Sequence, residues 1–461
     1  MIIKFKNLGP IESGEIDFND LKGINLIIGK NNTGKTYLSN LLYAYFKTRI
    51  IPQRNIKLNL KELVEKTKVI GFSSELSISV FEEIKNKYEV EYENKVKSLL
   101  PKIFHASQEK FKNFEITIDL ENEINEFKKS NGKLEVFFKD INKIIKLIKN
   151  KNEVKFLIED FEENNKDIFH GLKYNRKITL EKAKEIIFET LIYYKMKPKN
   201  YNFYSFPAER SGAILFYKQL LEGRNDKLRE MEIEFEMENF ENEISRYSEP
   251  VNDYIKFLNS IDDILGYTEL YNENSFVFES ILDGNIKLEE KGNIIFEIKE
   301  REELDMGLVS STVKTLAGFF LYLKYQAQKG DIIFIDEIEL NLHPENQRKI
   351  MKLINYLSKQ GLKFIISTHS PIITEEIDNM LLFEKVKDRI NKEEMEEYGL
   401  NEEYGLKSSD ISVFHLHNKT VEKIKAKDGE FEIETFNSVL EETDNLYQTL
   451  LFYTEGNNFG E

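Results

Sequence analysis

The sequence predicts an α/β fold, in which a mixed sheet built around a Gly-rich loop is interrupted by a long helical insertion. Three observations support this prediction. A short apolar segment runs directly into the Gly-rich loop 29–36, and a helical pattern follows it. A second apolar segment, Ile332 to Ile335, is followed by two adjacent acids. The sequence between the first and the second apolar segment is rich in Lys and Glu. Strand, loop and helix in this order are typical of the start of an α/β domain.

Residues 1–50 alternate short apolar segments with turns and are predicted to form the N-terminal part of the core domain. We expect strands at Ile2 to Phe5, Gly14 to Phe18 and Ile24 to Ile28, and a helix that begins near Lys35. The last strand and the helix enclose the Gly-rich loop, which places the loop at the end of a buried strand.

Residues 51–200 are predicted to form the helical insertion, an arm or a lid. Gly and Pro are sparse there, and apolar residues recur at helical spacing, most clearly in Leu120 to Phe127 and Ile141 to Phe161. The heptad pattern is too short to predict a long coiled coil. Lysines recur at helical spacing within and around the second segment, which favours a solvated face over a contact with nucleic-acid phosphates: Lys143, Lys146, Lys149, Lys151 and Lys155.

The C-terminal half of the chain returns to an α/β pattern. Residues 201–264 contain a predicted strand, Asn202 to Phe206, and a charged helical segment, and residues 426–461 form a C-terminal extension. Residues 265–425 complete the core domain. Their main predicted elements are the helices Thr312 to Ala327 and Glu345 to Lys359 and the strands Ile332 to Ile335, Lys363 to Ile366 and Ile411 to His417.

Composition excludes several classes of protein. The 461 residues contain no Cys, which excludes disulfides and thiolate metal sites. The N-terminus lacks the apolar region of a signal peptide, and no apolar run approaches the roughly 20 residues of a membrane span, so we expect a cytoplasmic protein without membrane contacts. The net charge of −16 argues against a protein that coats nucleic acid, although a local basic groove stays open.

The strongest motif is the Gly-rich loop itself, which fits the pattern G-x-x-x-x-G-K-[ST]. Glycines let such a loop curl so that its backbone N–H groups surround a phosphate. Lys35 can then reach the terminal phosphates of ATP, and the Thr36 hydroxyl can ligate Mg²⁺. The predicted ATP-binding residues of the loop are Gly29, Lys30, Asn31, Asn32, Thr33, Gly34, Lys35 and Thr36.

Two further motifs follow neighbouring predicted strands. Asp336 and Glu337 end an apolar strand, at the edge of a parallel sheet where α/β proteins bind ligands. Asp336 is suited to hold Mg²⁺, and Glu337 to polarise the attacking water. His369 ends the next strand, where it could contact the γ-phosphate of ATP. Together with Lys35, Glu337 and His369 are the predicted catalytic residues.

The set of motifs resembles the ATPase heads of the ABC/SMC type, in particular the OLD-like AAA-15/AAA-21 group. The resemblance covers roughly residues 1–50 and 300–420. It implies that the Ser turn at Ser310 and Ser311 corresponds to the family's signature segment, which contacts ATP bound by a second copy, so that catalysis requires a dimer. The family often has Gly where this chain has Thr312. It also implies that Glu209 and Arg210 lie in a loop that senses Mg²⁺ and water, whereas a surface Glu–Arg pair is the competing interpretation.

The expected function is that of an ATPase which dimerises around ATP and Mg²⁺ and signals to a separate protein. Stand-alone relatives of this size resemble ATPase subunits of bacterial anti-phage systems such as PARIS and Septu, which implies a separately encoded nuclease or Toprim effector. Two alternatives stay open. One is a DNA-repair or recombination ATPase of the RecF/SMC type that clamps DNA, and the other is a nucleotide-gated scaffold with little turnover.

Overall fold

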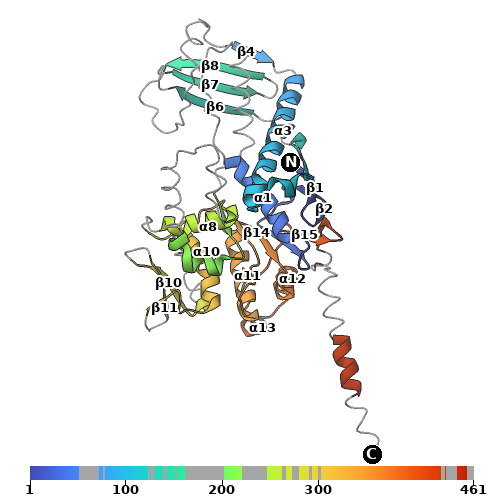
Figure 1. Ribbon diagram of the computed structural model, residues 1–461, viewed down its shortest axis with the longest axis vertical. Helices are drawn as coiled ribbons and strands as arrows, with labels where there is room; N and C mark the ends of the chain where they lie inside the picture. Colours follow the sequence, from blue (N-terminus) through green and yellow to red (C-terminus); the bar gives the residue numbers. More distant parts are fainter. Residues whose placement is uncertain are drawn as a thin grey trace, which may run out of the picture. The chain divides into compact units, whose positions relative to one another are not determined.

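The computed structural model describes residues 1–50, 72–75, 78–122, 125, 129, 131–138, 143–150, 153–160, 202–220, 247–261, 266–271, 280–289, 293–298, 303–426, 431 and 444–453 (Figure 1). The chain divides into two compact units. Unit 1 comprises residues 1–3, 45–96 and 116–200, and unit 2 comprises residues 4–44, 97–115 and 201–461. Among the described residues, no helix combines the length and the apolar character that crossing a membrane requires.

The centre of unit 2 is a set of parallel strands: β3 (Ile24–Gly29), β14 (Lys363–Thr368), β13 (Ile332–Ile335) and β9 (Phe203–Phe206). Every residue of β3 and β13 is buried, and both strands are rich in isoleucine. Continuous apolar runs of this kind suit strands that are covered on both faces. The strands predicted at Ile24 to Ile28, Ile332 to Ile335 and Lys363 to Ile366 are confirmed.

Further strands extend this sheet on the other side of β3. β15 (Ile411–His417) pairs with β3 in parallel, and β16 (Thr420–Ile424) pairs with β15 in antiparallel orientation. With β1 (Ile2–Leu8) and β2 (Ile11–Asp17), the order becomes β1-β2-β16-β15-β3-β14-β13-β9. The sheet therefore contains parallel and antiparallel pairs, which confirms the predicted α/β class with a mixed sheet.

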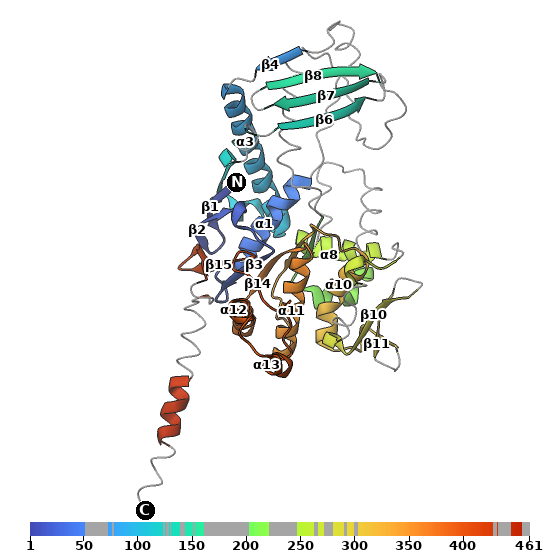
Figure 2. The same ribbon diagram turned by 180° about the vertical axis from the view of Figure 1, so that it is seen from behind.

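The helices of unit 2 pack aromatic and aliphatic side chains against this sheet. Phe206 on β9 makes edge-on ring contacts with Tyr254 and Phe257 of α8 and with Phe319 of α10. In both views α8 and α10 lie side by side (Figure 2). The bounds of the helices are α1 (Lys35–Ile50), α8 (Glu249–Ser260), α10 (Ser311–Tyr325), α11 (Pro344–Lys359), α12 (Pro371–Val386) and α13 (Lys392–Glu397).

Smaller elements complete unit 2. A sheet of order β10-β11-β12 is formed by Gly284–Leu288, Ile294–Ile298 and Glu303–Asp305. Short 3-10 helices occur at Phe18–Asp20 and Gln108–Phe111, and residues 210–220 and 444–453 are helical. Of the charged segment predicted to be helical between residues 213 and 261, residues 221–246 lie outside the described residues.

The insertion contains a long helix and also a sheet that the sequence analysis did not predict. α3 (Ile78–Ile103) is the long helix, and its Glu89 and Glu93 accept hydrogen bonds from the backbone N–H groups of Leu120 and Ile118 in β5 and just after it. β5 itself spans Glu115–Asp119. The sheet of unit 1 has the order β4-β8-β7-β6, formed by Phe72–Glu75, Glu153–Asp160, Lys143–Asn150 and Asn131–Phe138.

The helix predicted from Ile141 to Phe161 is therefore wrong. Its residues form the antiparallel strands β7 and β8, in which Asn150 pairs with Glu153 and Lys143 with Asp160. The segment is rich in Ile, whose branched side chain favours strands, and β7 and β8 pair with each other. The i, i+3 spacing of its lysines, which would gather them on one face of a helix, has no such meaning in a strand, where the period is two.

Candidate functional site

The Gly-rich loop connects β3 to α1 at the carboxyl edge of the central parallel strands. Three of its residues have positive φ values: Gly29 at 154°, Asn32 at 63° and Gly34 at 106°. A side chain at Gly34 would clash with Ile11, since a Cβ there would lie 2.7 Å from a carbon of that residue. Glycine is required at this position both for the backbone angle and for the close approach of β2.

The Lys35 ammonium is held inside this loop. It donates hydrogen bonds of 2.9 Å to the Gly29 carbonyl and 3.0 Å to the Lys30 carbonyl. Burial lowers the pKa of Lys35, while the negative charges of Glu337, Glu339 and Asp336 act in the opposite direction. The nearby carboxylates favour the charged form of Lys35, and an ammonium at the start of a helix, inside a Gly-rich loop, is suited to bind a phosphate group.

Thr36 and Asp336 bring hard oxygen atoms together from distant parts of the chain. The Thr36 hydroxyl lies 3.1 Å from Oδ2 and 3.5 Å from Oδ1 of Asp336, although the two residues are 300 positions apart. α1 supplies the threonine at its N-terminus, and the end of β13 supplies the aspartate. Hydroxyl and carboxylate oxygens are ligands that Mg²⁺ accepts, so these two residues fit the predicted metal position.

Ser367, near the end of β14, connects the two acids that follow β13. Its hydroxyl donates a short hydrogen bond to Asp336 and accepts one of 2.9 Å from the backbone N–H of Glu337. The sequence analysis did not identify Ser367. Its position in the sequence could have identified it. β13 and β14 pair in parallel through Ile335 and Ile366, so Asp336 and Ser367, the next residue of each strand, lie beside each other.

Glu337 adopts a left-handed backbone conformation, with φ at 48°. Residues other than Gly and Asn rarely adopt this conformation, and holding one there costs about 1–3 kcal/mol. The Glu337 carbonyl accepts a hydrogen bond of 2.8 Å from Arg210 and one of 3.0 Å from the N–H of Leu340. The turn that presents the Glu337 side chain is thus fixed by partners on both sides.

His369 is oriented by an acid that the sequence analysis left without a role. Glu339 accepts hydrogen bonds of 2.8 Å from the Thr368 hydroxyl and 2.7 Å from the backbone N–H of His369. The His369 Nδ1 atom lies 3.0 Å from the same carboxylate, and the imidazole is 40% exposed. Glu339 thereby ties the turn after β13 to the end of β14 and leaves the far side of the imidazole accessible.

Ser310 and Ser311 lie at the N-terminus of α10, and both are exposed. The Ser310 hydroxyl accepts a hydrogen bond of 3.3 Å from the N–H of Val313 and so caps the helix. The Thr312 hydroxyl donates to the Asn341 carbonyl at 2.8 Å. This bond attaches the start of α10 to the turn that follows the Asp336–Glu337 pair.

Glu209 and Arg210 point in different directions. Glu209 is exposed and lines a cavity of about 60 Å³, whose other walls include Thr36, Ser39 and Asp336. Glu209 thus lies in the same cavity as Thr36 and Asp336, the predicted metal ligands. Arg210 is 2% exposed and donates hydrogen bonds into the protein interior, so a surface Glu–Arg pair does not describe it.

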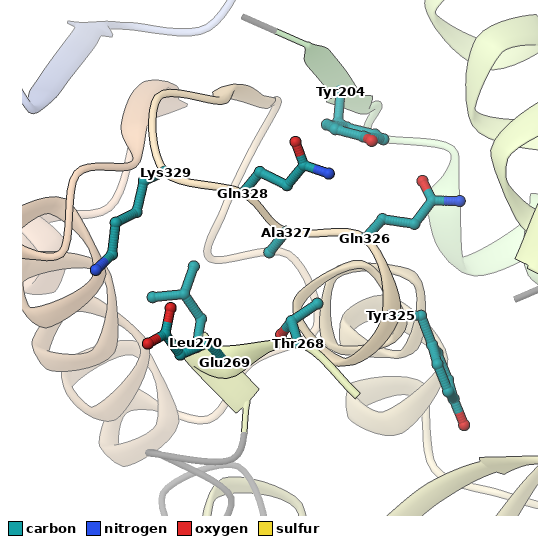
Figure 3. Close-up of a pocket in the computed structure, with 9 residues that line it drawn as sticks. All are labelled: Tyr204, Thr268, Glu269, Leu270, Tyr325, Gln326, Ala327, Gln328 and Lys329. Carbon is teal, nitrogen blue, oxygen red and sulfur yellow. The ribbon is translucent and has the colours of Figure 1, made fainter. Parts of the chain in front are cut away.

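A larger cavity of about 750 Å³ lies at the other ends of β9 and β13, away from the loop residues (Figure 3). Tyr204, on β9, and the segment 325–329, just before β13, line it together with Thr268, Glu269 and Leu270. Figure 3 shows the Gln326 and Gln328 carboxamides on the same side as Tyr204, with Lys329 extending away. Although this cavity is larger than the one beside Glu209, none of the phosphate-loop residues lines it, so we do not assign it as the nucleotide site.

Comparison with known protein families identifies an ATPase domain in the chain. The family model described as AAA ATPase domain matches residues 1–374. The chain belongs to this AAA ATPase domain family. Nucleotide binding follows from that membership, and hydrolysis of ATP is the activity that the family's description names.

The individual relatives are distant. The retron Vc95 probable ATPase of Vibrio cholerae serotype O1 biovar El Tor is 36% identical over 80 residues, which are 17% of this chain and 15% of that protein. The SMC head domain of Thermotoga maritima covers 92% of this chain and 98% of its own, at 9% identity and a TM-score of 0.30.

Two further SMC heads score similarly. A head bound to the C-terminal winged-helix domain of ScpA covers 93% of this chain and 95% of its own, at 12% identity and a TM-score of 0.31. A head with an extended coiled coil, bound to the C-terminal domain of ScpA from Pyrococcus furiosus, covers 96% and 98%, at 11% identity and a TM-score of 0.30. Scores this low support no inference about this chain.

Proposed function

We propose that this protein is an ATP-hydrolysing molecular switch in which two copies close over ATP. The observation that carries the proposal is the meeting of Lys35, Thr36 and Asp336 from two ends of the chain at one edge of the sheet. Membership of the AAA ATPase domain family supports the same activity. The remaining roles follow from how the neighbouring side chains are held.

In this proposal the loop 29–36 surrounds the phosphates of ATP through its backbone N–H groups, and Lys35 neutralises the terminal phosphates. Thr36 and Asp336 would hold Mg²⁺, which when bound neutralises charge that develops on the β- and γ-phosphates. Ser367 keeps the Asp336 carboxylate turned toward Thr36 by donating to its Oδ1 atom.

Glu337 is proposed to accept the proton of the attacking water. The left-handed turn at this residue presents its carboxylate beyond the end of β13, next to the metal ligand Asp336. His369, at the end of the neighbouring strand, is proposed to donate to the γ-phosphate; Glu339 accepts a hydrogen bond from its backbone N–H, and the Nδ1 atom lies 3.0 Å from the same carboxylate. A general base at this position contributes about 10²–10⁴-fold to the rate.

The second copy is proposed to complete the site through Ser310 and Ser311. These exposed residues present hydroxyls and the N-terminal N–H groups of α10, a combination suited to an anionic γ-phosphate. ATP would then hold two copies together, and hydrolysis would release them. The energy of nucleotide binding becomes a change in assembly that another protein can detect.

The partner is proposed to be a separately encoded effector of the nuclease or Toprim type, with the ATPase serving as the sensor subunit of a bacterial anti-phage system. This part of the proposal rests on the resemblance of the phosphate loop, the paired acids and the serine turn to those of such ATPase subunits. Purifying the protein from its native host would test it. A protein encoded by a neighbouring gene should co-purify, and Lys35→Ala should abolish protection against phage; failure of both results would overturn the defence role.

The ATPase proposal is tested by measuring ATP turnover and mass in solution for the wild type, Lys35→Ala and Glu337→Gln. Glu345→Gln is a matched control, because Glu345 lies on the surface of α11 and pairs with Lys349 at 2.7 Å. We expect both site variants to lose at least about 10²-fold in turnover, and Glu337→Gln to accumulate an ATP-dependent dimer. A wild type that neither hydrolyses ATP nor changes mass with it would overturn the proposal.

A further inference from the structure

Arg210 is the most deeply buried cation in the described part of unit 2 that faces the candidate site. Its side chain is 2% exposed and donates hydrogen bonds to backbone carbonyl oxygens of three separate segments. Burial lowers the pKa of Arg210, and the charges of Asp336, Glu339 and Glu337 act in the opposite direction. Burying a guanidinium costs desolvation free energy, and its hydrogen bonds to carbonyl oxygens offset part of that cost.

The guanidinium donates hydrogen bonds to the turn that carries Asp336 and Glu337. Nη1 donates to the Asp336 carbonyl at 2.6 Å, and Nη2 donates to the Glu337 carbonyl at 2.8 Å. In an extended strand, successive backbone units alternate in direction. The left-handed conformation of Glu337 breaks this alternation, and both carbonyls reach one guanidinium.

The same side chain also holds the helix that opens with the serine turn. Nε of Arg210 donates to the Thr315 carbonyl of α10 at 3.2 Å, and Nη1 also donates to the Pro207 carbonyl at 3.1 Å. Thr315 has a second link to the same region, because its hydroxyl accepts a hydrogen bond of 3.1 Å from Asn341. A displacement of α10 would therefore shift the guanidinium whose N–H groups hold the Asp336 and Glu337 carbonyls.

We propose that Arg210 is a positioning residue that sets the orientation of the Glu337 carboxylate and makes it depend on the position of α10. The inference rests on the proposed function, in which the N-terminus of α10 contacts ATP bound by a second copy. Engagement of that ATP by α10 would be transmitted through Thr315 and Arg210 to the chain's own Glu337. Hydrolysis at one site would thus depend on occupancy of the other.

Lysine cannot make the same set of hydrogen bonds as Arg210, so Arg210→Lys is the informative variant. Lysine keeps the positive charge but offers its donors from a single atom, whereas the planar fork of arginine reaches carbonyls on three segments. We expect ATP affinity to stay within about threefold of wild type and kcat to fall by roughly 10²-fold, the cost of a catalytic group displaced by about 1 Å. Thr315→Val, which loses only the bond from Asn341, should lower kcat in the same direction by less.

Tyr254→Phe is the matched control for burial. The Tyr254 ring is buried beside Arg210, and its hydroxyl has no hydrogen-bond partner among the described residues. Removing this hydroxyl should leave turnover unchanged. If Tyr254→Phe lowers kcat as much as Arg210→Lys does, general disturbance of the core accounts for both and the proposal falls.

A double-mutant cycle separates positioning from a purely structural role. In the Glu337→Gln background, Arg210→Lys should cause no further loss of turnover, because the group that it positions is already absent. The inference would be overturned if the losses of turnover from the two substitutions were additive. It would also be overturned if Arg210→Lys weakened ATP binding and lowered the melting temperature but left kcat unchanged. Full activity of Arg210→Lys beside an inactive Glu337→Gln would overturn the inference alone, while an inactive wild type would overturn the proposed function with it.

Discussion

Two aspartates lie at opposite ends of the same strand, and the contrast between them separates a structural carboxylate from a functional one. Asp331 directly precedes β13, and Asp336 directly follows it. Asp331 is 2% exposed and accepts hydrogen bonds from the Tyr322 hydroxyl at 2.9 Å, the Gln328 N–H at 3.0 Å and the Asn202 carboxamide at 3.3 Å. Asp336 is half-buried and accepts from two hydroxyls, those of Thr36 and Ser367.

The difference lies in what each carboxylate can still bind. The partners of Asp331 occupy both of its oxygens and hold the start of β13 against α10 and β9. A hydroxyl partner can turn its lone pairs toward a cation, so Thr36 and Asp336 can share one metal ion without losing their geometry. Burial and the number of donors, rather than the residue type, thus distinguish the two positions.

The largest effect should come from Asp336→Ala compared with Asp331→Ala, measured as ATP turnover. Loss of the proposed metal ligand Asp336 should reduce kcat by at least about 10²-fold, because charge on the phosphates is no longer neutralised. Asp331→Ala, at the other end of the strand, should keep turnover within about threefold of wild type at temperatures where the variant is folded. Equal losses in the two variants would contradict the contrast.

Stability should show the reverse order. Asp331→Ala leaves the buried Tyr322 hydroxyl and the Gln328 N–H without an acceptor, which should lower the free energy of unfolding by about 2–3 kcal/mol. Asp336→Ala should change it by less than about 1 kcal/mol, since its removal also relieves repulsion from Glu337 and Glu339. Chemical denaturation of both variants measures the two values directly.

A smaller change tests the hydrogen bond from Tyr322 to Asp331. Tyr322→Phe removes one donor to a buried carboxylate and should cost about 1.5 kcal/mol of unfolding free energy, with turnover unaffected. Tyr325→Phe, on the same helix, is the control and should cost less than about 0.5 kcal/mol. If the two variants lose equal stability, the bond to Asp331 is not what distinguishes this end of β13.

The sequence was sufficient to predict the elements that form the sheet around the loop. The strands before Gly29 and Asp336 are short, apolar and followed by groups with distinct chemistry, so position and type could both be predicted. Where two strands pair far from any motif, as in β7 and β8, local periodicity predicted a helix instead. β7 and β8 pair with each other through residues that are close in sequence, such as Asn150 and Glu153, and the lysine spacing in this segment resembled a helical face by coincidence.

The site itself was predicted in its chemistry but not in its supports. Lys35, Thr36 and Asp336 could be grouped because each stands at a strand end or loop with a known geometric meaning. Ser367 and Glu339 could not, since serine and glutamate at these positions are common on any surface. Arg210 was expected in a sensing loop, whereas its direction into the interior depends on carbonyl groups that no side-chain pattern reveals.

The smallest effect concerns pH and again separates the ends of β13. Burial raises the pKa of Asp331, and the hydrogen bonds from Gln328, Tyr322 and Asn202 act in the opposite direction. As pH falls through this raised pKa toward the ordinary value of the unfolded chain, the folded protein takes up a proton that the unfolded chain does not, so stability increases. The stability lost in Asp331→Ala should therefore be larger at about pH 4, near the ordinary pKa of Asp, than at about pH 7, with the variant and the wild type compared by chemical denaturation. A penalty that shrinks as the pH falls would mean that the carboxylate is stabilised in its charged form, and Asp331 would then resemble Asp336 more than the contrast allows.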